Sequence, residues 1–270
     1  MKKQLLVFGC SYSDKSYVEI TTKSEKLKEH MYDNKGNLTE PFDFWPEIMA
    51  KKLDMDLVNF AQCGFGNDGI YSTFVDEITK HNNIGMVIVM WSEFMRIGFE
   101  QEMRSIFSSK FDWLKINITA SDRNKHLRKR QIEITDVLHK NGLLSPASML
   151  RRSLRLFFSV QNICENMRKP YIQIMGMPPS KKEFEVEFCK NLIESPYLEQ
   201  INKTSYFGWP MFPQIDGYSC GSKLYDLDPN REKYFINSEN VHPSKLGQEY
   251  ITEMLYSRIN PDIIKYLTFL

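Results

Sequence analysis

A serine follows the first apolar run of the chain, within the stretch FGCSYSD at residues 8–14. A serine hydroxyl becomes a nucleophile when a general base takes its proton, and histidine is the usual base in proteins. Small polar residues at the end of a buried strand also serve as ordinary turn residues. Ser11 is therefore either a turn residue or a nucleophile, and the choice depends on a histidine that can reach it.

Among the histidines, His242 has the context of a general base. It lies in SENVHPSKLG, residues 238–247, directly before the last amphipathic segment. Glu239, three residues earlier, can turn back across the loop and accept a hydrogen bond from the second imidazole nitrogen, which fixes the tautomer and stabilises the imidazolium. These residues leave open a helix-entry loop in which His-Pro has no chemical role. The other histidines, in polar surroundings, are His30, His81, His126 and His139.

The composition indicates a folded protein without a dominant charge. The 270 residues are enough for one large domain, and we expect a single domain over residues 1–270. Apolar residues make up 42% and charged residues 26% of the chain, as is usual for soluble globular proteins. The formal net charge is +1, so no overall field favours nucleic acid or an anionic membrane as a partner.

The cysteines and the apolar runs argue against several kinds of site. The five cysteines are widely spaced without a CxxC pair, which fits neither a disulfide scaffold nor a zinc site and indicates reduced thiols in a cytosolic protein. No HExxH, EF-hand or Walker sequence is present, so we expect no metal and no cofactor. The run Leu5–Phe8 is shorter than the ~7–15 apolar residues of a signal peptide, and no run approaches a membrane span of ~18. We therefore expect a soluble protein.

Strands that alternate with helices would position the candidate residues. The predicted strands are residues 4–9, 56–59, 86–90, 170–175 and, last and shortest, 233–236. The predicted helices lie near 44–53, 70–78 and 149–164, and from 243 onward. This alternation implies a parallel sheet covered on both faces, and ligands bind such sheets at the carboxyl ends of the strands. Ser11, the glycine turn 63–67 and the residues after Met90 all follow strands, so we expect them at one edge.

Three segments carry weaker patterns. Residues 15–43 are polar and contain the turn signal DNKGN, which predicts a long surface loop. A helix is expected near 100–110, and the basic run 123–130 is typical of a solvated helix face. We expect 97–145 and 178–232 to be insertions between strands, or lid-like segments.

At this point the sequence resembles a known family. FGCSYSD, NFAQCGFGN at residues 59–67 and ENVHPSKLG at 239–247 are similar, in order and context, to three blocks of the SGNH (GDSL-type) hydrolases. These are esterases and acyl hydrolases on a flavodoxin-like α/β/α sandwich. The opening Gly-Cys-Ser-Tyr looks most like the small SGNH-like proteins often found in bacteriophage genomes. Residues 97–232 match nothing specific in the family.

The resemblance assigns roles to individual residues. It makes Ser11 the nucleophile, His242 the general base and Glu239 the orienting acid, where the family more often has aspartate. It also makes the backbone N–H of Gly64 a donor to the oxyanion, together with the N–H of Ser11.

The third family block is where this sequence departs from the pattern. The family has an asparagine in a Gly-x-Asn-Asp turn after the third strand, whereas this chain has MWSEFMR at residues 90–96. Losing one oxyanion donor typically lowers the rate by ~10²–10³-fold. We expect Asn67 or Ser92 to substitute for it. Glu93 would repel an oxyanion unless it is paired, with Arg96 as the candidate partner.

The resulting expectation is an α/β protein, a three-layer α/β/α sandwich, that acts as a serine esterase through an acyl-enzyme intermediate. The resemblance suggests a small-molecule or glycan ester, such as an O-acetylated carbohydrate. The cysteine pattern and the short first apolar run favour the cytoplasm of the producing or host cell, with association with a virion as the other location considered. As His242 becomes protonated, near the pH of ~6–7 expected for a general base, hydrolysis should fall.

Two alternatives belong to other functional classes. One is a weakly active or inactive binding protein, associated with a virion, that kept the fold while its third block changed. The other is a nucleic-acid-interacting protein that uses the basic run 123–130 together with Arg151 and Arg152.

Overall fold

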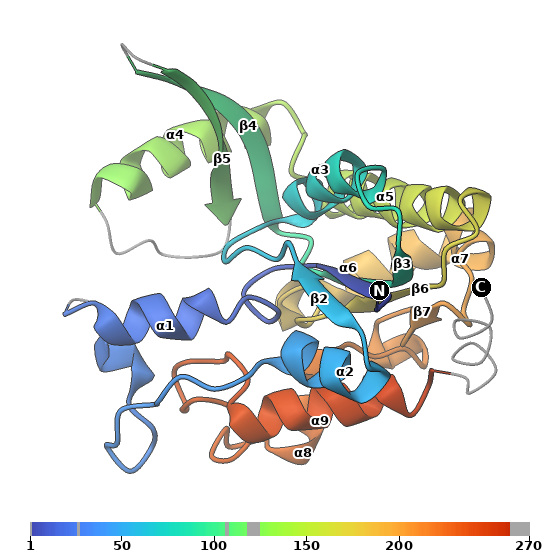
Figure 1. Cartoon of the computed structure of the whole chain (residues 1–270). Helices are drawn as coiled ribbons and strands as arrows, with labels where there is room; N and C mark the ends of the chain where they lie inside the picture. The colour runs from blue at the N-terminus through green and yellow to red at the C-terminus, as the bar shows by residue number, and fades with distance from the viewer. Residues whose placement is uncertain (1, 26–27, 106–107, 118–124, 260–270) are drawn as a thin grey trace.

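The computed structural model describes residues 2–25, 28–105, 108–117 and 125–259. Five strands form a parallel sheet in the order β2-β1-β3-β6-β7 (Figure 1). Numbered within the sheet alone, this is the 2-1-3-4-5 order of flavodoxin-like folds, in which ligands bind beside the first strand at the carboxyl edge. The strands are β1 (Gln4–Phe8), β2 (Asp56–Asn59), β3 (Ile84–Trp91), β6 (Tyr171–Met175) and β7 (Tyr206–Phe207).

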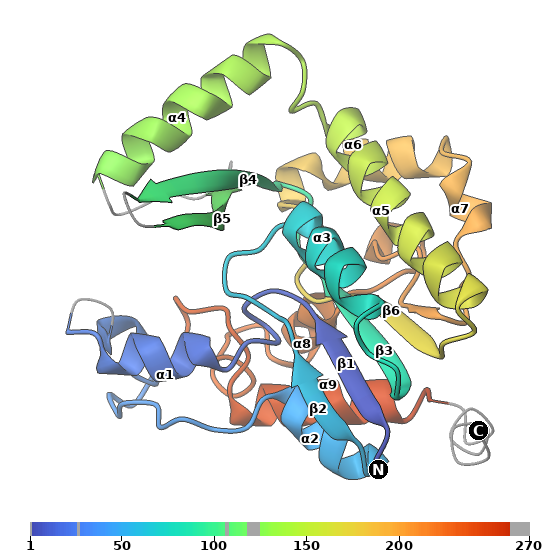
Figure 2. The same cartoon turned by 45° about the horizontal axis from the view of Figure 1, so that its top comes forward.

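Helices cover both faces of this sheet, which gives three α/β/α layers. α3 and α5 lie on one face, and α2, α8 and α9 lie on the other (Figures 1 and 2). α6 and α7 pack against α5. The bounds are α2 (Trp45–Leu53), α3 (Asn67–Ile78), α5 (Pro146–Asn166), α6 (Lys182–Ile193), α7 (Tyr197–Gln200), α8 (Cys220–Leu227) and α9 (Lys245–Tyr256). The predicted fold class is confirmed.

The central strand explains why the sheet could be recognised in the sequence. All eight residues of β3 are buried, because helices cover the strand on both faces. Its last residue, Trp91, packs on Phe157 of α5 with ring centroids 4.6 Å apart, and its indole N–H donates to Gln173 Oε1 at 3.0 Å. The carboxyl end of β3 is thus fixed in the core, next to the end of β1.

The segment after β3 differs from the prediction. A helix near 100–110 is wrong, because this segment forms an antiparallel hairpin of β4 (Arg96–Ser105) and β5 (Ser108–Asn117). The alternation of Ile97 and Phe99 with smaller or polar residues has the period of a strand. The hairpin stands out from the sheet, with α4 (Lys125–Lys140) beside it (Figure 2). Part of the basic run 123–130 begins α4, and Arg123 lies outside the described residues.

Two further segments also differ from their predictions. Residues 15–43 are not only loop, since they contain α1 (Ser16–Lys23) and the 3₁₀ turn η1 (Lys28–Met31). Val18, Met31, Phe44 and Ile236 form a second buried cluster that holds this segment to the protein. The predicted strand 233–236 is replaced by a single bridge between Phe235 and Pro243, and β7 is the fifth strand of the sheet. A second 3₁₀ turn, η2 (Pro213–Ile215), precedes α8.

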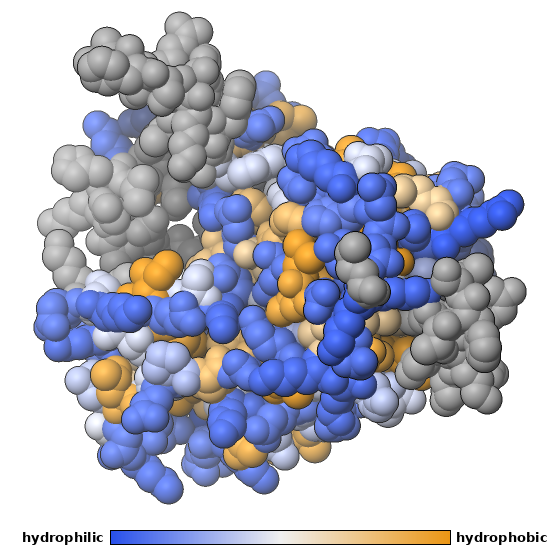
Figure 3. All heavy atoms as spheres, in the orientation of Figure 1, coloured by the Kyte–Doolittle hydropathy of each residue, from blue (hydrophilic) through white to orange (hydrophobic). Residues whose placement is uncertain are grey.

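The surface drawn in Figure 3 is mostly hydrophilic, with apolar side chains scattered among charged ones. In the part of the chain that the structure describes, no helix combines the length and the apolar character needed to cross a lipid bilayer. All five cysteines are free, and only Cys63 is exposed.

Candidate active site

Ser11 and His242 meet at the carboxyl edge of the sheet. Ser11 lies in the turn that follows β1, and His242 lies just before α9. The distance between His242 Nε2 and Ser11 Oγ is 2.8 Å. The backbone carbonyl of His242 accepts a hydrogen bond from Ile236 N at 2.9 Å, and Ser244 caps α9 through its side chain, so the loop that carries the imidazole is fixed on both sides.

The other imidazole nitrogen is held by Asn240. His242 Nδ1 lies 2.8 Å from Asn240 Oδ1. The amide orientation follows from its other contact, because Asn240 Nδ2 donates to the backbone carbonyl of His30 at 2.9 Å. The amide oxygen therefore accepts from the ring, Nδ1 carries the hydrogen, and the lone pair of Nε2 faces the hydroxyl of Ser11.

The expectation for Glu239 as the orienting acid is wrong. Its side chain is exposed, and its backbone N–H donates to Asn237 Oδ1 at 2.9 Å. The same oxygen accepts the N–H of Asn240 at 2.7 Å, which makes a tight turn. This turn buries Asn240, whose Oδ1 also accepts the backbone N–H of His242 at 3.2 Å. The signal in the sequence was an asparagine two residues before the histidine, a spacing at which Asn commonly bonds its own backbone.

Among the residues that the structure describes, the partner of His242 Nδ1 is the neutral amide of Asn240, not a carboxylate. Restricted access to water, and then the positive charge of Arg96, lower the pKa of His242 to about 3. The expected loss of activity near pH ~6–7 assumed an imidazole with an ordinary pKa, and this lowered value overturns that assumption. At neutral pH the imidazole is neutral, as a general base must be.

Tyr17 covers the imidazole on one face. Its ring stacks on that of His242 with centroids 3.9 Å apart, and its hydroxyl lies 3.3 Å from Asn240 Oδ1. Burial raises the pKa of Tyr17 to about 12, so the phenol is neutral. A second tyrosine holds the residue before His242, since the Tyr12 hydroxyl donates to the carbonyl of Val241 at 2.7 Å. The histidine loop is therefore clamped by two tyrosines from the segment that carries the serine.

The serine loop is itself held from three directions. Trp45 Nε1 donates to Ser13 Oγ at 3.1 Å, and Asn59 Nδ2 donates to the carbonyl of Ser13 at 2.8 Å. Gln248 Nε2 of α9 donates to the carbonyl of Tyr12 at 3.2 Å. Because α2, β2 and α9 each contribute a bond, the position of Ser11 is fixed by the packed layers.

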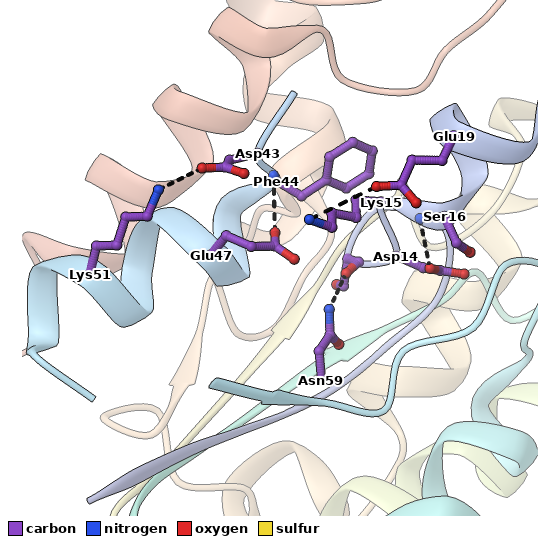
Figure 4. Close-up of polar contacts among 10 residues, drawn as sticks. Asp14, Lys15, Ser16, Glu19, Asp43, Phe44, Glu47, Lys51 and Asn59 are labelled. Carbon is purple, nitrogen blue, oxygen red and sulfur yellow. Dashed lines mark hydrogen bonds and ion pairs between the residues drawn. The ribbon is translucent and has the colours of Figure 1, made fainter. Parts of the chain in front are cut away.

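Asp14 joins the serine loop to the glycine turn. One carboxylate oxygen accepts the backbone N–H of Ser16 at the start of α1, at 3.0 Å (Figure 4). The other accepts the backbone N–H of Cys63 at 2.8 Å. The N–H of Gln62 also donates to the carbonyl of Gly9 at 3.1 Å. The glycine turn is thus bonded to both ends of the loop that contains Ser11.

The glycine turn has the form of a type II β-turn. Phe65 N donates to the carbonyl of Gln62 at 3.2 Å, and Gly64, at the third position, has a φ of +83°. Within the described part of the chain, the N–H groups of Gly64 and Ser11 donate to no acceptor. Two backbone donors on bonded neighbouring loops are therefore available to an anion.

Asn67 and Ser92 do not take the place of the missing family asparagine. Asn67 Oδ1 accepts the backbone N–H of Ser92 at 2.9 Å, and its Nδ2 donates to Ser153 Oγ at 3.0 Å. Both residues are buried, and Ser92 Oγ lies 3.8 Å from the sulfur of Met177. Asn67 opens α3 with its amide turned into the core, where it ties α3 and α5 to the end of β3. This role is structural and corrects the expectation.

The predicted pairing of Glu93 with Arg96 is confirmed. Arg96 Nε lies 2.9 Å from Glu93 Oε1, and each side chain is 15% exposed. A Cβ on Gly66 would lie 2.7 Å from the carbonyl of Arg96, so this pair is packed against the glycine turn. The guanidinium thereby compensates the acidic charge that would oppose an oxyanion.

A cavity beside the hairpin lies apart from the site formed by Ser11 and His242. It has a volume of about 600 Å³ and lies between β4, the end of α4 and the start of α5. Arg151, Arg152 and Arg155 contribute to its walls, and neither Ser11 nor His242 does. Arg152, one of the residues considered for nucleic acid, forms an ion pair with Asp68 at 2.7 Å. Across residues 2–25, 28–105, 108–117 and 125–259, no cluster of three or more potential metal ligands occurs.

Comparison with known proteins gives only distant structural likeness. No family model and no curated protein match the chain. Solved structures that resemble it include one described as a lipolytic protein of the G-D-S-L family from Desulfitobacterium hafniense DCB-2, with 13% identity and a TM-score of 0.45. Others are the acetyl xylan esterase AlAXEase, with 11% identity and a TM-score of 0.43, and a GDSL-like lipase from Parabacteroides merdae ATCC 43184, with 9% identity and a TM-score of 0.45.

These three alignments cover 95% of this chain, and 99%, 99% and 95% of the respective structures. The likeness is too distant to assign this chain to a family or to an activity.

Proposed function

We propose that this chain is a serine esterase of the SGNH type, with Ser11 as nucleophile and His242 as general base. The observation that carries the proposal is the 2.8 Å contact between Ser11 Oγ and His242 Nε2, with the ring oriented by Asn240 from its far side. Nucleophile, base and orienting group within hydrogen-bond reach are the signature of nucleophilic acyl transfer. An asparagine as the third member also occurs in Cys-His-Asn sites.

The reaction would proceed in two halves. Ser11 Oγ attacks the ester carbonyl while His242 Nε2 takes the hydroxyl proton, and the N–H groups of Ser11 and Gly64 bind the oxyanion. The tetrahedral intermediate collapses, the imidazolium gives its proton to the leaving alcohol, and the acyl group stays on Ser11. Water then attacks the acyl-enzyme with His242 again as base, which releases the acid and restores the hydroxyl.

The electrostatics of the site favour a reaction in which the imidazolium of His242 and the oxyanion form in the same step. Burial and then the positive charge of Arg96 lower the pKa of His242, so an isolated imidazolium is unfavourable there, and the neutral Asn240 at Nδ1 adds no opposite charge. During the attack the imidazolium and the oxyanion form together, so each charge is compensated by the other.

The substrate class follows from the motif resemblance alone, and the cytoplasmic setting from the cysteine pattern. We propose an ester of a small molecule or glycan, with an O-acetylated carbohydrate as the leading candidate. The Gly-Cys-Ser-Tyr opening suggests a phage-type protein that acts in the cytoplasm of the producing or host cell, folded as a single domain over 1–270.

A fluorophosphonate probe tests the proposal directly, because it reacts with a serine only when a base activates it. Wild-type protein should be labelled at Ser11 and should release acetate from a small acetyl ester. Ser11→Ala and His242→Ala should lose both activities. Ser159→Ala, a matched change on the exposed face of α5, should keep them.

A folded wild-type protein that neither reacts with the probe nor turns over acetyl esters would remove the hydrolase proposal. A binding or virion-associated role would then be the better hypothesis.

A further inference from the structure

The inserted hairpin reaches back to the glycine turn through one lysine. Lys115 of β5 donates from Nζ to the backbone carbonyl of Cys63 at 2.8 Å. The same ammonium lies 4.7 Å from the ring centroid of Phe65, and Trp113 packs edge-on against that ring at 5.8 Å. The base of the hairpin is therefore seated on the turn that contains Gly64.

The carbonyl that Lys115 binds belongs to the peptide unit that carries the Gly64 N–H. In a trans peptide, the C=O and the N–H point in opposite directions. Lys115 on the carbonyl side therefore directs the Gly64 N–H away from the hairpin. In a type II turn this central peptide takes no part in the turn's own hydrogen bond, which here joins Phe65 N to Gln62 O.

The central peptide of such a turn has two orientations. Type I and type II turns differ by a flip of this unit, and the flip reverses the direction of the N–H. Glycine at φ +83° favours the observed orientation, and the ammonium holds the carbonyl in it. A cation on the carbonyl also polarises the amide, which makes the N–H a stronger donor.

We propose that Lys115 is a positioning residue for the oxyanion site, and that it fixes and strengthens the Gly64 N–H as a donor. The inserted hairpin thereby compensates for the third-block asparagine of the family, which this chain lacks. This inference rests on the proposed esterase function. It assigns to the hairpin, which matches nothing in the motif resemblance, a role in the chemistry.

The test compares Lys115→Met, which keeps the chain length without the charge, with Lys115→Arg, which keeps a cationic donor. Loss of an entire oxyanion donor lowers rates by ~10²–10³-fold, so a weakened donor should lower kcat of Lys115→Met by about 10–100-fold. KM should change little, and the rate of fluorophosphonate labelling should fall in parallel with kcat. Lys115→Arg should recover most of the activity.

Lys223→Met is the matched control, since Lys223 also lies over an aromatic ring, that of Tyr218, in another part of the protein. Thermal unfolding of each variant shows whether it is folded, and Lys115→Gln replaces the methionine variant if that variant does not fold. A lysine with a purely structural role would lower Tm and leave kcat intact.

An active wild-type enzyme whose folded Lys115→Met or Lys115→Gln variant keeps kcat within about twofold overturns this inference alone. A wild-type protein without labelling or turnover overturns the esterase proposal instead, so the two failures are distinguishable.

Discussion

Asn240→Asp places a carboxylate where a neutral amide oxygen now accepts the Nδ1 hydrogen of His242 at 2.8 Å. An opposite charge at this range shifts a pKa by about 1–3 units. The pKa of His242, about 3 in the wild type, should therefore rise to about 4–6 in the variant. This corresponds to about 1–4 kcal/mol of added imidazolium stability.

The assay is the pH dependence of kcat/KM, followed by acetate released from a small acetyl ester, with the ring resonances of His242 titrated in parallel. The acidic limb should move up by about 1–3 pH units in Asn240→Asp. The new oxygen also faces the carbonyl of His30, which Asn240 Nδ2 now binds, so the variant should lose about 1–3 kcal/mol of stability. Profiles are therefore read only where circular dichroism shows folded protein.

Asn240→Ala is the matched control, since it removes the acceptor without adding a charge. This variant should have a lower kcat/KM, because the imidazole ring loses its fixed tautomer. Since no carboxylate is added, the acidic limb of its pH profile should not shift upward. The reasoning is refuted if the limb of Asn240→Asp lies no higher than that of the wild type, or no higher than that of Asn240→Ala.

Two further predictions concern stability. The pKa of His242 is about 3 in the folded protein against an ordinary 6.5, so its contribution to the free energy of unfolding is complete above pH 6.5 and is lost as the pH falls toward 3. Between pH 7 and pH 5, the free energy of unfolding measured with urea should therefore fall by up to about 2 kcal/mol more in the wild type than in His242→Gln. Arg96→Met should destabilise the protein by up to about 3 kcal/mol, because it removes the guanidinium from a largely buried ion pair with Glu93. Urea unfolding of Glu93→Gln/Arg96→Met should recover part of that loss.

The sequence predicts the sheet well because its central strands are buried on both faces. β3 is a continuous apolar run, and β1 and β6 are apolar apart from one glutamine each, a composition typical of parallel strands under helices. The hairpin of β4 and β5 was predicted as a helix, since its charged and apolar residues mix without a long apolar run. The pairing of β4 with β5 depends on contacts between the two strands, and the spacing of residues along the chain does not reveal these contacts.

The site was predictable where chemistry is tied to residue type. Ser11 and His242 stood out because serine and histidine are residue types that serve as nucleophile and base, and the structure brings them to 2.8 Å from each other. Asn240 was missed in favour of Glu239, because the direction of each side chain is set by a turn in which Asn237 accepts two backbone N–H groups. Lys115 was missed because its contact with Cys63 depends on where the hairpin sits in the folded protein.

The contact between Ser11 and His242 joins residues 231 positions apart, and this separation sets the order in which the site is made. A ribosome that adds ~5–20 residues per second needs roughly 10–50 s to pass from the serine codon to the histidine codon. Throughout that interval the nascent polypeptide carries its hydroxyl without a base. Under the proposed function, the nucleophile therefore gains its base only late in synthesis, and a translation product that stops before His242 should not hydrolyse esters.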